Sequence, residues 1–146
     1  LPPWYENIKK RQVKSPKLFI TDSGLLHALL DLKDQRAVER HPLLGASWEG
    51  YAMQQVIQHI GAEPSQCYFW ATHQGAELDL VVVQGPKRRG FEFKWTDTPK
   101  KTKSMRIALN ELGLKHIDVL HAGSKSYPLD KKIRAVALSD LGALSS

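Results

Sequence analysis

Apolar residues recur at helical spacing in three segments of the chain. The first predicted helix covers 23–31, where leucines repeat every three to four residues after Asp22, a typical N-cap residue. The second and longest covers 42–60, with Pro42 in its first turn and a glycine directly after its end. The third covers 102–112 and also ends before a glycine.

Elsewhere the apolar pattern has a period of two, which predicts strands. The predicted strands cover 67–72, 77–83, 90–95, 117–122 and 133–138. We expect the first three to form an antiparallel meander, with a turn at Gly85-Pro86 that has a basic tip. The third helix can cross over and place the fourth strand parallel to a neighbour. The predicted fold class is therefore α/β, with a mixed central sheet flanked by helices.

Residues 1–21 differ from the remainder because they carry three prolines and a dense basic run. Proline fixes φ and removes an amide donor, so this segment is expected to be extended chain, a linker or an edge hairpin. Residues 18–20 are compatible with a short strand. The basic run is interpreted either as a solvated tether or as a contact for an anionic partner.

The composition fits one folded domain. The chain has 146 residues, of which 42% are hydrophobic and 25% charged. Its single cysteine, Cys67, excludes an internal disulfide framework and a multi-cysteine zinc site.

No run of about 18 apolar residues predicts a membrane span, so a reducing cytoplasm is the expected compartment. The net charge of +6 favours a polyanionic partner such as nucleic acid. The start of the chain lacks an initiator Met and a signal-peptide pattern, and indicates a fragment.

One acid falls within the apolar arc of the longest predicted helix. Successive residues lie about 100° apart, which places Glu49 inside that arc. The arc consists of Ala46, Ala52, Met53, Val56, Ile57 and Ile60. Burying an unpaired carboxylate is costly, so this position is unusual. In the alternative arrangement Trp48 and Leu44 define the buried face and Glu49 lies at its margin.

Acids and a lysine alternate along two neighbouring predicted strands. Glu77 and Asp79 share one face, whereas Leu78, Leu80 and Val82 share the other. In the next strand Glu92 and Lys94 share a face, and Phe91, Phe93 and Trp95 point the opposite way. If the strands pair, the acids and the lysine meet on one face. We expect the longest helix to cover that face and bring Glu49 toward them.

Carboxylates converging with a lysine form a site for a hard cation. Mg²⁺ and Mn²⁺ favour carboxylate and water ligands, and such ions can be held against a phosphate. A neighbouring lysine can orient the attacking water and stabilise the charge that develops. These are the requirements of phosphodiester hydrolysis.

The spacing Asp79, Glu92, Lys94 reads D-x₁₂-E-x-K and resembles the PD-(D/E)xK nuclease superfamily. The resemblance implies a restriction-endonuclease-like core of helix, three-strand meander, helix and strand, the order predicted above. It assigns Asp79 and Glu92 as ligands of Mg²⁺ or Mn²⁺, Glu49 as support for the metal or its water, and Lys94 as the residue that positions the nucleophile. Leu78 stands where the motif often has a proline.

Four further segments resemble the DUF4143 domain, the C-terminal domain of a group of prokaryotic AAA-type ATPases. They are 17–25, 48–50, 75–79 and 91–94. The resemblance implies that a covalently attached ATPase module and a winged-helix-like segment precede the domain. It divides the chain into 1–21, a linker or the end of that preceding module, and 22–146, a PD-(D/E)xK nuclease-like domain. The glycines of 85–90 have phosphate-loop spacing without the Lys-Ser/Thr that must follow, so no nucleotide binding is expected there.

The sequence therefore predicts a nuclease-like domain that binds or hydrolyses DNA, more than RNA, with Mg²⁺ or Mn²⁺. The alternative is a non-catalytic module on the same fold, which binds nucleic acid, regulates, or forms a homo-oligomer. The candidate nucleic-acid contacts are Lys87, Arg88, Arg89, Lys100, Lys101 and Lys103.

The histidines lack ligand spacing, so His73 and His121 are interpreted as surface or satisfied structural residues. Cys67 and the aromatics Tyr68, Phe69 and Trp70 are interpreted as core residues.

Overall fold

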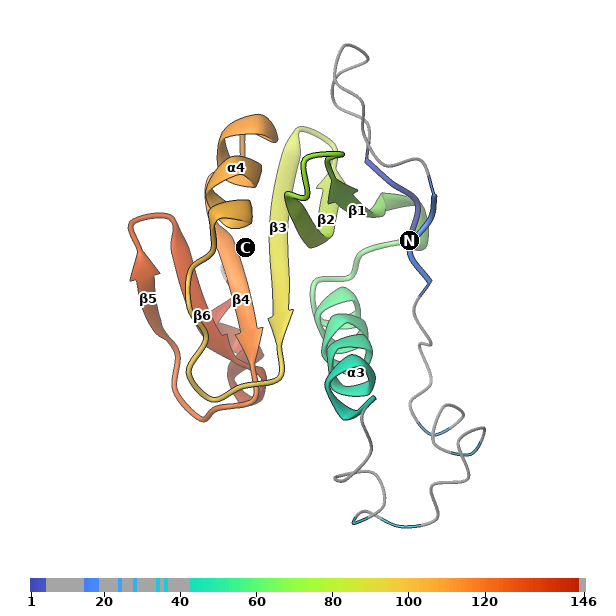
Figure 1. Ribbon diagram of the computed structural model, residues 1–146, viewed down its shortest axis with the longest axis vertical. Helices are drawn as coiled ribbons and strands as arrows, with labels where there is room; N and C mark the ends of the chain where they lie inside the picture. The colour runs from blue at the N-terminus through green and yellow to red at the C-terminus, as the bar shows by residue number, and fades with distance from the viewer. Residues whose placement is uncertain are drawn as a thin grey trace.

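The computed structural model describes residues 1–4, 15–18, 24, 28, 34, 36 and 43–144. It shows a mixed α/β domain built on a six-stranded sheet with the strand order β1-β2-β3-β4-β6-β5 (Figure 1). The elements are α3 (Leu44–His59), η1 (Pro64–Gln66), β1 (Cys67–Ala71), β2 (Glu77–Gln84), β3 (Lys87–Lys94), α4 (Lys103–Glu111), β4 (Ile117–His121), β5 (Tyr127–Asp130), β6 (Ile133–Ala137) and η2 (Leu138–Ala143). None of the helices in the described ranges has both the length and the apolar character of a membrane span.

The predicted meander and crossover are confirmed. Strands β1, β2 and β3 pair antiparallel in chain order. Helix α4 then connects β3 to β4, which pairs parallel with it, and β6 pairs parallel with β4. The sequence missed β5, a four-residue edge strand that carries Pro128 and is at most partly buried. It lacks an alternating apolar face, which is the signal that reveals a strand. The helix predicted over 23–31 falls outside the described residues except at Gly24 and Ala28.

Apolar side chains form two core layers, one on each face of the sheet. Helix α3 buries Ala52, Met53 and Val56 in a layer that includes Phe91 and Phe93 of β3. Helix α4 buries Met105, Ala108 and Leu112 in the layer on the other face, with residues of β2, β4 and β6. Burial on both faces explains why the central strands read as almost continuous apolar runs.

This arrangement corrects the predicted position of the longest helix. It covers the phenylalanine face of β3 and not the face that carries Glu92 and Lys94. The apolar side of α3 gains most by burying aromatic rings, which explains the choice of face. Trp48 joins the α3 core layer and Glu49 is half-buried beside it, whereas Ala46, predicted to lie in the arc, is exposed. Glu49 therefore lies at the margin of the buried face, as in the alternative arrangement.

A β-bulge in β2 interrupts the alternation of side chains at Asp79. Tyr68 of β1 pairs with Val81, but Trp70 pairs with Leu78, so β2 has one extra residue between these pairs. As a result Leu78 and Val81 both belong to the α4 core layer, and Leu80 belongs to the α3 layer. The prediction that Leu78 and Leu80 share a face is wrong for this reason. Bulges re-aim single side chains, and here the re-aimed position is Asp79.

Gly90 lets β3 pass close to its neighbours. A Cβ atom at this position would lie 2.7 Å from Leu114 Cδ1, 3.0 Å from Leu78 Cδ2 and 3.2 Å from Ile117 Cγ1. The absence of a side chain at Gly90 therefore sets the packing of β3 against the α4 layer, two residues before Glu92.

We expect Gly90→Ala to lower the free energy of unfolding by about 1–3 kcal/mol, because overpacking displaces the surrounding side chains. Urea unfolding followed by tryptophan fluorescence measures the change. Gly142→Ala is the control, since its Cβ would meet nothing within 4 Å. Equal stability of the two variants would show that β3 does not need the close approach at Gly90.

Candidate functional site

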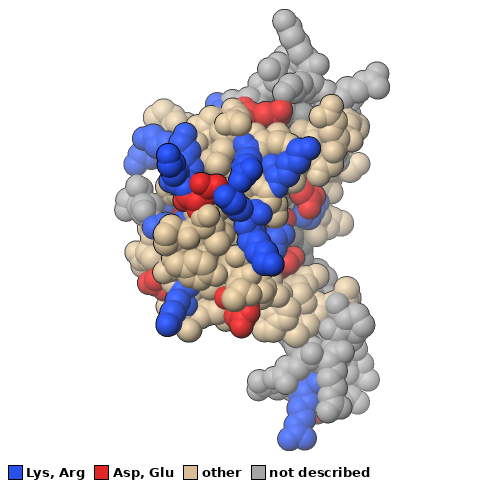
Figure 2. All heavy atoms as spheres, turned by 60° about the vertical axis from the view of Figure 1, so that its left-hand side comes forward, with Lys and Arg blue, Asp and Glu red and all other residues tan. Residues whose placement is uncertain are grey.

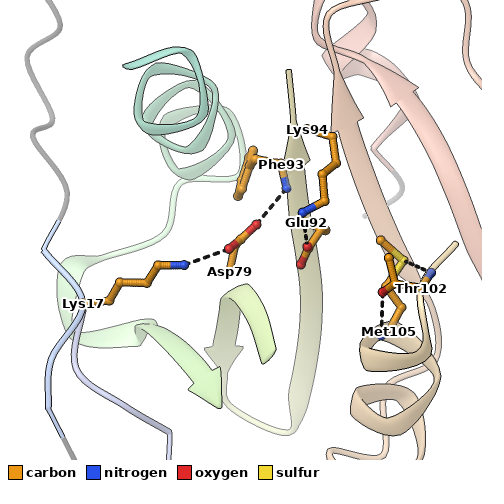
Figure 3. A network of polar contacts seen from close by, with 7 residues as sticks. All are labelled: Lys17, Asp79, Glu92, Phe93, Lys94, Thr102 and Met105. Atoms are coloured by element: carbon orange, nitrogen blue, oxygen red, sulfur yellow. Dashed lines mark hydrogen bonds and ion pairs between the residues drawn. The ribbon is translucent and has the colours of Figure 1, made fainter. Parts of the chain in front are cut away.

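Strands β2 and β3 separate where the bulge lies, and the side chain of Asp79 fills the position. Their pairing runs from Gln84↔Lys87 to Leu80↔Phe91. Beyond that pair the Phe93 backbone N–H donates to Asp79 Oδ2 at 3.1 Å (Figure 3). The buried carboxylate thus accepts the hydrogen bond that a backbone carbonyl would otherwise accept.

The other oxygen of Asp79 faces a lysine from the N-terminal segment. Lys17 Nζ lies 3.0 Å from Asp79 Oδ1. The segment is attached to edge strand β1, where the Phe69 N–H donates to the Pro2 carbonyl at 3.0 Å. The Lys17 N–H in turn donates to the Leu1 carbonyl at 3.0 Å, which places the lysine beside the sheet. At Lys17 the segment is therefore part of the site and not a solvated tether.

Glu92 is the most deeply buried acid of the site. It is 4% exposed, and Lys94 Nζ lies 2.7 Å from its Oε1 (Figure 3). Its Oε2 is buried and has no hydrogen-bond partner within the described part of the chain. A buried carboxylate oxygen without a donor is costly, and such atoms occur where a site accepts a further group.

Burial is the largest cause of an unusual protonation equilibrium at Glu92. Burial, and then the nearby Asp79 carboxylate, raise the pKa of Glu92 to about 7, although Lys94 and a hydrogen bond from the Asp79 backbone N–H lower it. Burial lowers the pKa of Lys94, but Glu92, Asp79 and Glu49 together raise it above its ordinary value. Lys94 therefore stays protonated at neutral pH, while Glu92 can exchange a proton there.

Glu49 of α3 lies near enough to Asp79 and Lys94 for their charges to shift its pKa. Burial raises the pKa of Glu49, and the Asp79 carboxylate raises it further. Lys94, Lys17 and a hydrogen bond from the Trp95 backbone N–H lower it by less. The structure thus brings Glu49 into the field of Asp79 and Lys94, as the sequence predicted.

The structure supports a divalent cation held by two carboxylates more clearly than one held by three. Asp79 and Glu92 repel each other, and Glu92 Oε2 is free of hydrogen bonds among the described residues. Across the described ranges, however, no three His, Cys, Asp or Glu side chains are grouped so that they could hold one ion. A joint ligand role of Glu49 with this pair stays a prediction.

The predicted nucleic-acid contacts divide into two groups. Lys87, Arg88 and Arg89 begin β3 at the far end from Glu92, and the hairpin tip is only Gly85-Pro86. Arg88 Nη1 donates to the Leu112 carbonyl at 3.1 Å, so this side chain is partly structural.

The second group lies before and at the start of α4. Lys100 and Lys103 are exposed, and Lys101 Nζ lies 2.9 Å from Asp130 Oδ2. Figure 2 shows Lys and Arg side chains gathered over the face to which α4 and β5 contribute. This surface suits an anionic partner in part, because Asp130 already neutralises Lys101.

The remaining polar and aromatic residues take the structural roles expected of them. His121 is buried; its Nδ1 accepts from the Gly123 N–H at 3.1 Å and its Nε2 lies 3.1 Å from the Lys125 carbonyl. Cys67, Phe69 and Trp70 are buried, whereas Tyr68, also predicted to be a core residue, is only half-buried and its hydroxyl donates to the Ser65 carbonyl at 2.7 Å. Lys17 is the site residue that the sequence did not single out as such, because its partner lies 62 positions away.

Comparisons with known proteins place two families along the chain. The model of DUF4143, a domain of unknown function, matches residues 44–141, and that of DUF8612, also a domain of unknown function, matches 1–36. Uncharacterized proteins of Mycobacterium bovis and Mycobacterium tuberculosis are each 46% identical over 136 residues, 93% of the chain. The chain spans 30% of the length of these relatives. No solved structure matches it.

The raised pKa of Glu92 predicts a pH-dependent cost of folding. The carboxyl has an ordinary pKa of 4.5 and a folded pKa of about 7, so between these values the folded chain binds more protons than the unfolded chain. Stability conferred by the protonated form is complete below pH 4.5 and is lost as the pH rises through 7. We expect Glu92→Gln to match the parent at low pH and to exceed it by about 1–3 kcal/mol at pH 8.

Urea unfolding in the presence of EDTA, at several values of pH, measures this difference. Glu77→Gln, an exposed position on β2, is the control and should show no comparable gain. A constant difference between Glu92→Gln and the parent from pH 4.5 to 8 would contradict the assignment.

Proposed function

The chain belongs to the DUF4143 family, and we propose that its acidic site is the catalytic centre of a PD-(D/E)xK-type nuclease, which hydrolyses phosphodiester bonds of DNA with Mg²⁺ or Mn²⁺. The observation that carries the proposal is the convergence of Asp79, Glu92 and Lys94 where β2 and β3 separate. The buried, unpartnered Glu92 Oε2 supports a site that accepts a cation.

The order of elements supports the same proposal. Helix α3 precedes the meander β1–β3, and α4 leads to the parallel strand β4. This is the order of a restriction-endonuclease-like core, with the two acids and the lysine on the second and third strands of the meander. A fold hosts many functions, so the proposal depends on the site residues more than on this order.

Each residue has a role that follows from its environment. Asp79 and Glu92 would hold the cation, and when bound the cation polarises the phosphate and makes water a better nucleophile. Lys94, whose pKa is raised, stays protonated and so orients the water and stabilises negative charge on the phosphate rather than removing a proton. Glu49, half-buried at the margin, would hold a water molecule in place.

The second candidate function is a non-catalytic module that binds nucleic acid on the same fold. It is favoured by one observation, that the described residues group no three potential ligands around one ion. It requires only the basic surface, so its binding would survive the loss of Asp79 and would weaken steeply with salt. The activity and the partners of the longer relatives are likewise proposals, including an attached ATPase module.

The nuclease proposal predicts that Mn²⁺ binding and DNA cleavage fail together. We expect Asp79→Asn and Glu92→Gln to abolish the calorimetric Mn²⁺ signal and to reduce cleavage of labelled DNA by at least about 100-fold. Glu77→Gln is the matched control, because it removes an exposed acid from the same strand. DNA binding without cleavage, unchanged in Asp79→Asn, would favour the second function instead.

The Lys17–Asp79 contact predicts that this lysine competes with the cation. A charge-assisted hydrogen bond contributes about 1.5–3 kcal/mol, so its loss should tighten Mn²⁺ binding about tenfold or more. We therefore expect Lys17→Met to bind Mn²⁺ more tightly than the parent, whereas Lys100→Met, at an exposed position, should not. Weaker binding by Lys17→Met would show that Lys17 supports the site rather than competing for it.

A further inference from the structure

A pocket lies at the start of β3, at the opposite end of the strand from the acidic site. It has a volume of about 430 Å³ and is lined by residues of the β2–β3 hairpin and of the segment that joins α4 to β4. Its basic lining consists of Lys87, Arg88, Arg89, Lys115 and His116. None of the described residues that line it is acidic. The proposed nuclease centre uses none of these side chains, so the pocket is a separate feature.

Two buried donors of Arg89, which lines the pocket, lack hydrogen-bond partners among the described residues. Its Nε and Nη2 atoms are buried and have no hydrogen-bond partner in the described part of the chain. The guanidinium carbon lies 5.3 Å from the centroid of the Phe91 ring, a contact that leaves those two donors unused. Burial lowers the pKa of Arg89, as expected for a cation that has lost water without gaining an equal partner.

The nearest acid is already committed to another arginine. Asp118 Oδ1 accepts from Arg134 Nε at 3.0 Å and from Arg134 Nη2 at 2.8 Å. Its Oδ2 lies 3.3 Å from His116 Nε2 but is buried without a hydrogen-bond partner among the described residues, so Asp118 is paired through one oxygen only. Asp118 raises the pKa of Arg89 by less than burial lowers it. The positive charge of the pocket is therefore only partly compensated from within the protein.

The donors that line the pocket match the oxygen atoms of a phosphate group. Planar guanidinium groups present paired donors that match phosphate oxygens, and lysines add charge without fixed geometry. The apolar side chains of the lining are Pro86 and Leu112, and its one aromatic ring among the described residues is the imidazole of His116. The volume is enough for a phosphate or diphosphate with a small attached group. Two further exposed lysines, Lys131 and Lys132, line the adjoining pocket, which shares His116.

We propose that this pocket binds a terminal phosphate or diphosphate group, with Arg89 as its buried anchor and Lys115 at its rim. A small phosphate ester and the 5′-phosphate end of a nucleic-acid strand present the same chemistry. In either case the ligand brings negative charge to a described lining that contains no acid and completes the partial charge balance beside Arg89.

Calorimetric titration of the 146-residue chain with pyrophosphate tests the proposal. We expect Arg89→Gln and Lys115→Ala each to weaken pyrophosphate binding about tenfold or more, since each removes a charge-assisted contact. Lys125→Ala removes one exposed positive charge outside the pocket and should change the affinity less than about twofold. Lys115 is itself exposed, so its variant tests the pocket even if Arg89→Gln fails to fold.

Competition then identifies the source of the phosphate. Displacement of pyrophosphate by a 5′-phosphorylated oligonucleotide, and not by its 5′-hydroxyl form, would assign the pocket to strand ends. Displacement by ribose 5-phosphate alone would assign it to small phosphate esters. Equal losses in Lys115→Ala and Lys125→Ala, or no pyrophosphate binding by the parent, would overturn the proposal. Asp79→Ala should leave pyrophosphate binding intact, so the failure of either site can be told from the failure of the other.

Discussion

The hydrogen bond from the Phe93 N–H to Asp79 is the contact on which the arrangement of the acidic site depends. Because one carboxylate oxygen takes the place of a strand neighbour, β2 and β3 can diverge without leaving that backbone donor unsatisfied. The bulge that re-aims Asp79 and the close packing at Gly90 both act on the same short stretch of the two strands. Loss of this bond would leave a buried donor unpaired and would move Glu92 and Lys94 together with the backbone of β3.

The charges of the acidic site are only partly balanced by its ion pairs. Asp79 is paired with Lys17, and Glu92 with Lys94, each through one oxygen. Both lysines are partly exposed, whereas both acids are largely buried, so the acids lose more hydration than the lysines return. The raised pKa of Glu92 is the measure of that deficit. A site that stores such a cost gains stability when it binds a cation or a proton, which is the property that the proposed function requires.

The sequence predicted the meander, the crossover and the two long described helices, because each has a strong apolar period and glycine or proline at its ends. It also placed Glu92 beside Lys94, since alternation along β3 needs only local information, whereas Asp79 reaches them at a bulge that breaks the alternation of β2. The sequence did not predict which faces of β2 Leu78 and Leu80 occupy, because one extra residue changes the register there. A bulge inside a run of apolar residues does not alter the pattern from which strands are predicted. The sequence also could not place Lys17, since a contact across 62 positions depends on how the N-terminal segment meets β1.

The two family matches give that last contact a wider meaning. Lys17 lies within the segment that matches DUF8612, and Asp79 lies within the segment that matches DUF4143. The ion pair therefore joins two segments that the family models treat as separate, and it does so at Asp79 of the acidic site. A movement of the first segment along β1 would withdraw a positive charge from Asp79 and leave a carboxylate oxygen open. Among the described residues, the side chain of Lys17 thus couples the electrostatics of the acidic site to the position of the N-terminal segment.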